Sequence, residues 1–133
     1  MWFRSVGRQQ DRFGHTAGDR TLHFISRSLS RALRKGDLVG RIGGEEFALL
    51  LVNSSAEEAV EVMDRIRSGI ATGFHDETTP VPVTASFGVT AVELGGGSAE
   101  DMLAEALDQA DRALYRSKIE GRNRTTLAVL TEA

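Results

Sequence analysis

Several features are missing from this sequence of 133 residues, and each absence excludes a class of protein. There is no cysteine, which excludes a disulfide framework and any metal site built from thiolates. No apolar run is long enough to cross a membrane, so we expect no membrane insertion. The beginning of the chain lacks the apolar segment of a signal peptide, which favours a cytoplasmic location. The hydrophobic content of 41% is ordinary, and the length suits one domain over residues 1–133.

Charges are distributed unevenly along the chain, although the net charge is only −3. Residues 1–35 contain eight basic and two acidic side chains, whereas residues 43–111 contain two basic and fourteen acidic ones. Basic ends around an acidic middle suit a phosphate ligand that is held together with a cation. Most single charges on a domain of this kind nevertheless lie on solvated helix faces.

Hydrophobic periodicity predicts three helices and a sheet. The predicted helices cover residues 19–35, a segment capped by Ser55 with Glu58, and a segment capped by Ser98 and ended by Gly121. The core faces of the second and third helices are predicted to be Ala59, Met63, Ile66 and Ile70, and Leu103, Leu107, Ala110 and Leu114. The predicted strands are residues 38–42, 47–52, 125–130 and a half-buried alternating run at 81–89, with a further short strand at 2–6. Helices over one antiparallel-rich sheet make an α+β sandwich.

One stretch, RIGGEEFALLL at residues 41–51, places two glycines and two glutamates in a tight turn ahead of an apolar strand. Glycines let a ligand approach the backbone because no Cβ intrudes. Carboxylates beside such a turn can bind Mg²⁺, which takes oxygen ligands and shares them with substrate phosphates. The turn alone suggests a nucleotide and a metal, although polar hairpin tips are common.

Four motifs in order resemble the GGDEF domains, the diguanylate cyclases of cyclic di-GMP signalling. RIGGEEFALLL resembles the family signature in its GGEEF form, and FGHTAGD at residues 13–19 resembles the segment after the family's first metal-binding loop. RKGD at residues 34–37 has the spacing of the family's RxxD inhibitory site, and ADRALYRSKIEGRN at residues 110–123 is similar to its C-terminal helix and phosphate-binding segment. The resemblance covers most of the chain and implies a palm-like fold shared with nucleotidyl cyclases and polymerases.

In this family two copies of the domain each bind one GTP. The resemblance therefore implies a homodimer that converts two GTP into cyclic di-GMP and two pyrophosphates, with two Mg²⁺ per site and no nucleic-acid polymer as partner. It implies that Glu46 assists deprotonation of the attacking hydroxyl and that Glu45 binds metal. The residues implied to bind substrate are Gly43, Gly44, Asp19, Gln10, Lys118 and Arg122. Those implied at the inhibitory site for cyclic di-GMP are Arg34, Asp37 and Arg65, the last reached from a neighbouring domain.

The sequence departs from the family at its start. The family opens with a strand that ends in a DxDxFKxxND-like loop, in which the first Asp binds metal and the Asn contacts guanine. An ungapped alignment puts Trp2 at that Asp and Gln10 at the Asn; alternatively FRSV at residues 3–6 matches the loop and GRQQ at 7–10 is an insertion. Under either alignment the metal-binding Asp is absent, and most of the first strand is expected to be missing with it.

Two hypotheses follow from this mixture of retained and missing motifs. The first is a diguanylate cyclase whose catalysis is impaired by the missing Asp. The second is a non-catalytic module that binds cyclic di-GMP or GTP and acts through the RxxD site at Arg34 and Asp37.

Overall fold

A computed structural model describes residues 2–7, 14–43, 46–92 and 98–128, and for residues 2–7 and 14–17 it describes the backbone alone. Helices and strands alternate through these ranges in the α+β manner expected. In chain order they are β1 (Trp2–Gly7), α1 (Gly14–Ala32), β2 (Leu38–Arg41), β3 (Glu46–Leu50), α2 (Ala56–Ala71), β4 (Phe74–Asp76), β5 (Thr79–Val81), β6 (Ala85–Thr90), α3 (Ala99–Ile119) and β7 (Thr125–Leu127).

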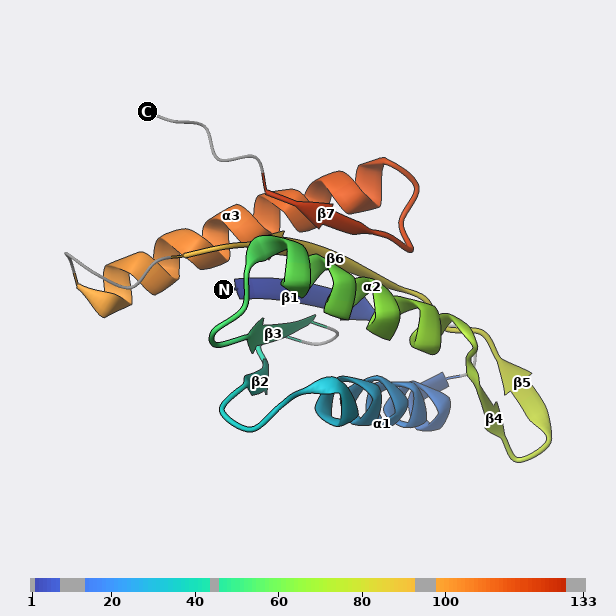
Figure 1. The fold of residues 1–133 in the computed structure, drawn as a ribbon. Helices are drawn as coiled ribbons and strands as arrows, with labels where there is room; N and C mark the ends of the chain where they lie inside the picture. Colours follow the sequence, from blue (N-terminus) through green and yellow to red (C-terminus); the bar gives the residue numbers. More distant parts are fainter. Residues whose placement is uncertain (1, 8–13, 44–45, 93–97, 129–133) are drawn as a thin grey trace.

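The main sheet has five strands in the order β2-β3-β1-β6-β7 (Figure 1). Strand β1 is antiparallel to both of its neighbours, β3 and β6, whereas β6 and β7 are parallel. The chain thus places its first strand at the centre of the sheet, between two strands that come much later in the sequence.

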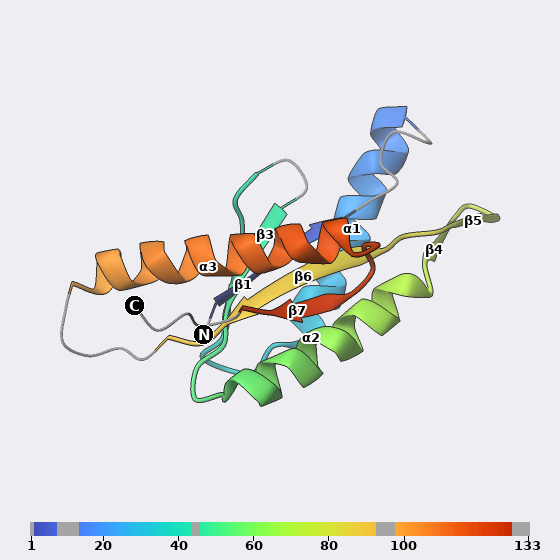
Figure 2. The ribbon, with the colours of Figure 1, turned by 90° about the horizontal axis from the view of Figure 1, so that it is seen from above.

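Helices cover both faces of this sheet, with α3 on one side and α1 and α2 on the other (Figures 1 and 2). The core between the sheet and the α1–α2 side is apolar and includes Ile25, Leu29, Met63, Ile70, Phe87 and Val89, all fully buried. Within the described residues, none of the helices is both long enough and apolar enough to cross a membrane.

The predicted ends and faces of α2 are confirmed. Ser55 precedes the helix, and its Oγ accepts a hydrogen bond from the Glu58 N–H at 3.1 Å, while the Ser55 N–H donates to Glu58 Oε1 at 3.4 Å. This is the reciprocal capping box that the sequence predicts. The four residues predicted on its core face, Ala59, Met63, Ile66 and Ile70, are the buried ones.

Strand β6 differs from the prediction, because all six of its residues are buried rather than alternate ones. One face joins the apolar core, and the other lies under α3. The hydroxyl groups on that second face are hydrogen-bonded: Thr90 Oγ1 donates to Gln109 Oε1 at 2.9 Å, and Ser86 Oγ accepts from the Asn123 N–H at 3.1 Å. The alternating pattern of apolar and polar residues predicted one exposed face, but the polar residues of β6 are also buried, under α3.

Helix α3 contacts β6 through small side chains. Its fully or nearly buried residues are Ala106, Ala110, Ala113, Leu114 and Ser117, whereas the predicted Leu103 and Leu107 are only half-buried. The contact is close at Gly88 of β6, where an added Cβ would lie 2.0 Å from the Ala110 carbonyl oxygen and 2.3 Å from the Leu114 nitrogen. The spacing located the helix and two residues of its contact face, Ala110 and Leu114, but the two leucines lie at the edge of that face.

The short strand predicted at residues 2–6 is confirmed, although most of the family's first strand was expected to be missing. Trp2–Gly7 form six residues of strand that pair on both sides, with β3 and with β6.

The hairpin β4–β5 was not predicted at all. Its tip contains no glycine, and Glu77 there takes a positive φ of 60°, so the usual sequence signal is missing. The hairpin projects beyond the end of the main sheet (Figure 2). It is tied to α1 by an ion pair between Arg20 and Asp76 and by the Phe24 and Phe74 rings, whose centroids are 5.2 Å apart.

We predict that Gly88→Ala will destabilise the fold by at least about 1–3 kcal/mol, because the added methyl group would meet the backbone of α3, which has to move away. Chemical denaturation of the purified variant measures this change.

The control is Gly69→Ala in α2, where no atom lies within 4 Å of an added Cβ. In a helix interior this change should stabilise by roughly 0.5–1 kcal/mol. Equal stabilities of the two variants would contradict the close approach of α3 to β6.

Candidate functional site

The turn between β2 and β3 is closed by hydrogen bonds from its flanks. The Ile42 N–H donates to the Glu46 carbonyl at 2.9 Å, and Arg41 Nε donates to the Gly43 carbonyl at 3.2 Å. Gly43 is exposed and Glu46, the first residue of β3, is half-buried. The predicted site residues Gly44, Glu45 and Gln10 lie outside the described residues.

The register of β1 decides which residues stand beside this turn. Val6 is paired with Glu46, and Gly7 ends the strand one residue further on. Trp2 is paired with Leu50, four residues further along β3, which is roughly 13 Å from the turn at the usual strand rise. A metal ligand that acts with Glu45 has to stand beside the turn, so Trp2 does not hold that position. The structure therefore disfavours the ungapped alignment.

Asp19 lines a cavity of about 450 Å³ beside the turn, between α1 and the hairpin of β2 and β3. The cavity is lined by Asp19, Leu22, His23 and Ser26 from α1 and by Val39, Gly40, Arg41 and Phe47 from the hairpin. The structure thus joins Asp19 to the GGEEF hairpin, as the family resemblance implies. His23 and Ser26 were not singled out, although they follow Asp19 at helical spacing.

Lys118 and Arg122 lie near the end of α3, as the sequence predicts, but in different surroundings. Lys118 lies in the last turn of α3 and lines a separate hollow on that helix with Tyr115, Arg116 and neighbouring residues. Arg122 lies beyond the end of the helix, so the two residues do not share one helical face. Neither of them is among the residues that line the Asp19 cavity.

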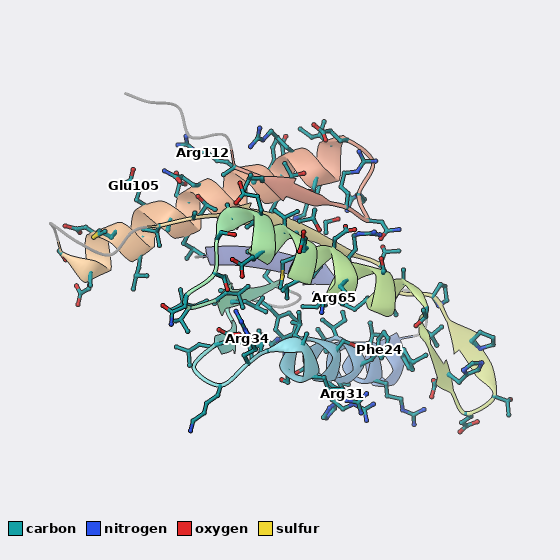
Figure 3. All side chains as sticks on the ribbon, in the orientation of Figure 1. Phe24, Arg31, Arg34, Arg65, Glu105 and Arg112 are labelled. Atoms are coloured by element: carbon teal, nitrogen blue, oxygen red, sulfur yellow. The ribbon has the colours of Figure 1, made fainter. Side chains whose placement is uncertain are left out.

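A second cavity, of about 310 Å³, brings together all three residues of the predicted inhibitory site. Arg34 and Asp37 lie in the loop that follows α1, and Arg65 lies on α2 (Figure 3). The remaining lining residues are Ala32, Leu51, Glu58, Glu61 and Val62. Arg65, which the resemblance implies is reached from a neighbouring domain, also lines this cavity within its own chain.

Asp37 already has a structural role in this cavity. Its Oδ2 accepts from the Arg34 N–H at 2.9 Å, and its Oδ1 accepts from the Val52 N–H at 3.1 Å. The Arg34 guanidinium donates to Ser54 Oγ at 2.8 Å. The carboxylate therefore fixes the loop, and Ser54 holds the arginine beside it. Sequence reasoning had not identified Ser54.

The described residues do not assemble a metal site. They contain no group of three or more His, Asp or Glu side chains that could hold an ion. On the paired strands at the turn, Glu46 of β3 is the one described carboxylate, because Val6 and Gly7 of β1 carry none. Asp19 lies on α1, across the cavity, and Glu45 is outside the described residues. A site for two Mg²⁺ needs several oxygen ligands, so this set does not fit one.

The comparison with protein families identifies the chain. The model of the diguanylate cyclase GGDEF domain matches residues 7–124. The chain belongs to the GGDEF family. The predicted fold class is confirmed by solved GGDEF and GGEEF domains, and the family is one of cyclic di-GMP signalling.

Two curated relatives illustrate the match. Diguanylate cyclase DgcP of Pseudomonas aeruginosa is 42% identical over 122 residues, which is 91% of this chain and 17% of that protein. Diguanylate cyclase A of Treponema denticola is 37% identical over 119 residues, covering 89% of this chain and 31% of that one. The chain thus spans less than a third of the length of either relative.

Two solved structures are close in shape. The active GGEEF domain of a diguanylate cyclase from Vibrio cholerae gives a TM-score of 0.83 at 27% identity, over 98% of this chain and 83% of that one. The GGDEF domain of DgcB from Caulobacter crescentus, in complex with c-di-GMP, gives 0.81 at 25% identity, over 95% and 75%.

Proposed function

We propose that this GGDEF domain binds GTP and cyclic di-GMP and catalyses the family reaction weakly or not at all. The reaction joins two GTP into cyclic di-GMP and releases two pyrophosphates. The observation that carries the proposal is the register of β1, which sets Val6 and Gly7 beside the GGEEF turn. We further propose a homodimer in the cytoplasm, as in the family's reaction scheme.

GTP binding is supported by what the chain retains. Asp19 lines the cavity beside the hairpin, and a carboxylate can accept two hydrogen bonds from the N1–H and N2–H edge of guanine. Gly43 leaves the turn open to a ligand. We assign the β- and γ-phosphates to Lys118 and Arg122, because charge-assisted hydrogen bonds to phosphate are the strong ones.

Catalysis needs more than binding. Lewis-acid stabilisation by metal ions contributes several kcal/mol to phosphoryl transfer, and each ~1.4 kcal/mol corresponds to a tenfold change in rate. The described residues do not fit a two-metal site, so this stabilisation is the contribution that we propose is reduced. The chain retains both glutamates of the turn, and Glu46 is the one we propose takes up the proton of the attacking hydroxyl.

Cyclic di-GMP binding is supported by the cavity of Arg34, Asp37 and Arg65. Two guanidinium groups can fork onto phosphate oxygens or onto the O6 and N7 atoms of guanine. Glu58 and Glu61 line the same cavity and oppose an anion there, so we expect the guanine bases, rather than the phosphates, to face them.

An active diguanylate cyclase is the second candidate. It is favoured by the intact GGEEF turn and by the likeness to the active Vibrio cholerae domain. A turnover assay separates the two candidates.

We predict that the purified chain, given GTP and Mg²⁺, forms little or no cyclic di-GMP above the level of Glu46→Gln, because no carboxylate of β1 stands beside the turn. Chromatography of the products measures this. A rate of about 1 s⁻¹ or more, within the usual range of enzymes, that disappears in Glu46→Gln would establish the second candidate.

We also predict that Arg34→Ala weakens cyclic di-GMP binding by roughly 1.5–3 kcal/mol, since it removes a charged donor. Arg34→Lys should weaken it less, because it keeps the charge and loses the fork. Titration calorimetry measures both variants.

The matched control is Arg31→Ala, an exposed arginine of α1 that points away from this cavity (Figure 3). It should bind as the unaltered chain does. Binding that survives both Arg34 changes and fails in Glu46→Gln would move the ligand to the GGEEF turn.

A further inference from the structure

The turn that carries Arg122 has an unusual backbone. Gly121, Arg122 and Asn123 follow one another with positive φ values of 124°, 63° and 47°. Glycine adopts this region freely and asparagine tolerates it, but for an arginine the left-handed conformation costs about 1–2 kcal/mol. Surrounding contacts must therefore hold the turn in place.

Two buried serines accept hydrogen bonds from the backbone of the turn. The Arg122 N–H donates to the Ser117 carbonyl at 2.8 Å, and the Asn123 N–H donates to Ser86 Oγ at 3.1 Å. Both serines are fully buried. Further along, the Phe87 N–H donates to the Arg124 carbonyl at 3.0 Å, which joins the turn to β6.

Arg67 of α2 holds the side chain of Asn123. Its Nη1 donates to Asn123 Oδ1 at 3.0 Å and approaches the Asn123 carbonyl at 3.5 Å. Its Nε donates to Asp64 Oδ1 at 2.8 Å, so the guanidinium is aligned between a carboxylate on its own helix and an amide of the turn. The Arg67 side chain is only 19% exposed.

Asp64 keeps its charge over most of the pH range. The hydrogen bond from Arg67 is the main cause that lowers the pKa of Asp64 below its usual value, and burial acts against it. Thr125 Oγ1 lies 3.5 Å from the same carboxylate oxygen. The pair of charges that orients Arg67 therefore persists at neutral pH.

The guanidinium of Arg122 stands apart from this network. Only its backbone enters the hydrogen bonds of the turn, and within the described part of the chain no acidic side chain lies within ion-pair distance of it. The Arg122 side chain is exposed. The turn thus fixes the backbone of Arg122 and leaves its guanidinium accessible to a ligand.

We propose that Arg67 is a positioning residue for the phosphate site: by holding Asn123 it keeps the turn left-handed and directs Arg122 toward the β- and γ-phosphates of GTP. The inference rests on the proposed function, because it needs Arg122 to bind phosphate. Arg67 itself touches no ligand and acts through Asn123.

The test is titration calorimetry with GTP and with GMP, each with Mg²⁺, on the full chain and its variants. GMP lacks the β- and γ-phosphates, so a phosphate-directed effect should appear with GTP alone. We expect Arg67→Ala to weaken GTP binding roughly tenfold, within the range of couplings between residues of one network, and to leave GMP binding unchanged. Arg67→Lys should weaken GTP binding less, because it keeps a donor and the charge.

Arg122→Ala and the double variant complete a cycle. If Arg67 acts through Arg122, the double variant should bind GTP no more weakly than Arg122→Ala does. Arg31→Ala, an exposed arginine outside the network, serves as the matched control and should bind both nucleotides normally. Asn123→Gly removes the amide that Arg67 holds and leaves a backbone that adopts positive and negative φ equally well, so the turn is no longer fixed. It should show the same selective loss of GTP binding if Arg67→Ala fails to fold.

The possible failures are distinguishable. A loss of GTP binding in Arg122→Ala but in neither Arg67→Ala nor Asn123→Gly overturns the inference and leaves the proposed function standing. Equal losses of GTP and GMP in Arg67→Ala show general damage to the fold and also overturn it. If Arg122→Ala binds GTP as the unaltered chain does, Arg122 does not bind phosphate. That part of the proposed function is then wrong, and so is the inference that rests on it.

Discussion

The pairing of β1 between β3 and β6 is the constraint on which the rest of the structure depends. Because β1 lies between β3 and β6, its register fixes how these two strands are aligned with each other. It also fixes which residues of β1 stand beside the GGEEF turn. Val6 lies opposite Glu46 in the pairing of β1 with β3, and the pairing of β1 with β6 joins this half of the sheet to the strand that α3 covers. A shift of one residue would exchange the faces of β1. The register of β1 therefore governs both the packing of the sheet and the set of residues at the GGEEF turn.

The face of β6 beneath α3 serves packing and function together. Gly88 has no side chain, which allows the α3 backbone to approach the strand closely. Ser86 Oγ accepts a hydrogen bond from the Asn123 N–H in the turn that contains Arg122. Helix α2 connects the two candidate sites, since Arg65 lines the cavity of the RxxD motif and Arg67 holds Asn123. One helix therefore contacts both of the regions that are proposed to bind nucleotides.

Much of the fold could be predicted from the sequence, because its signals are local. The capping box of Ser55, the apolar face of α2 and the glycine turn at Gly43 each depend on a few neighbouring residues. The features that were missed depend on tertiary structure. The register of β1, the left-handed turn at Arg122 and the bond of Arg34 to Ser54 join segments far apart in the chain. The hairpin β4–β5 lacks the glycine that would have indicated it.

The most direct test of the account restores a carboxylate beside the turn. Val6→Asp and Gly7→Asp are compared with the unaltered chain for cyclic di-GMP formed from GTP and Mg²⁺, each with and without Glu46→Gln. The account predicts little or no Glu46-dependent product from the unaltered chain and clearly more from at least one aspartate variant. Glu46-dependent turnover in the unaltered chain, not increased by either aspartate, would contradict it.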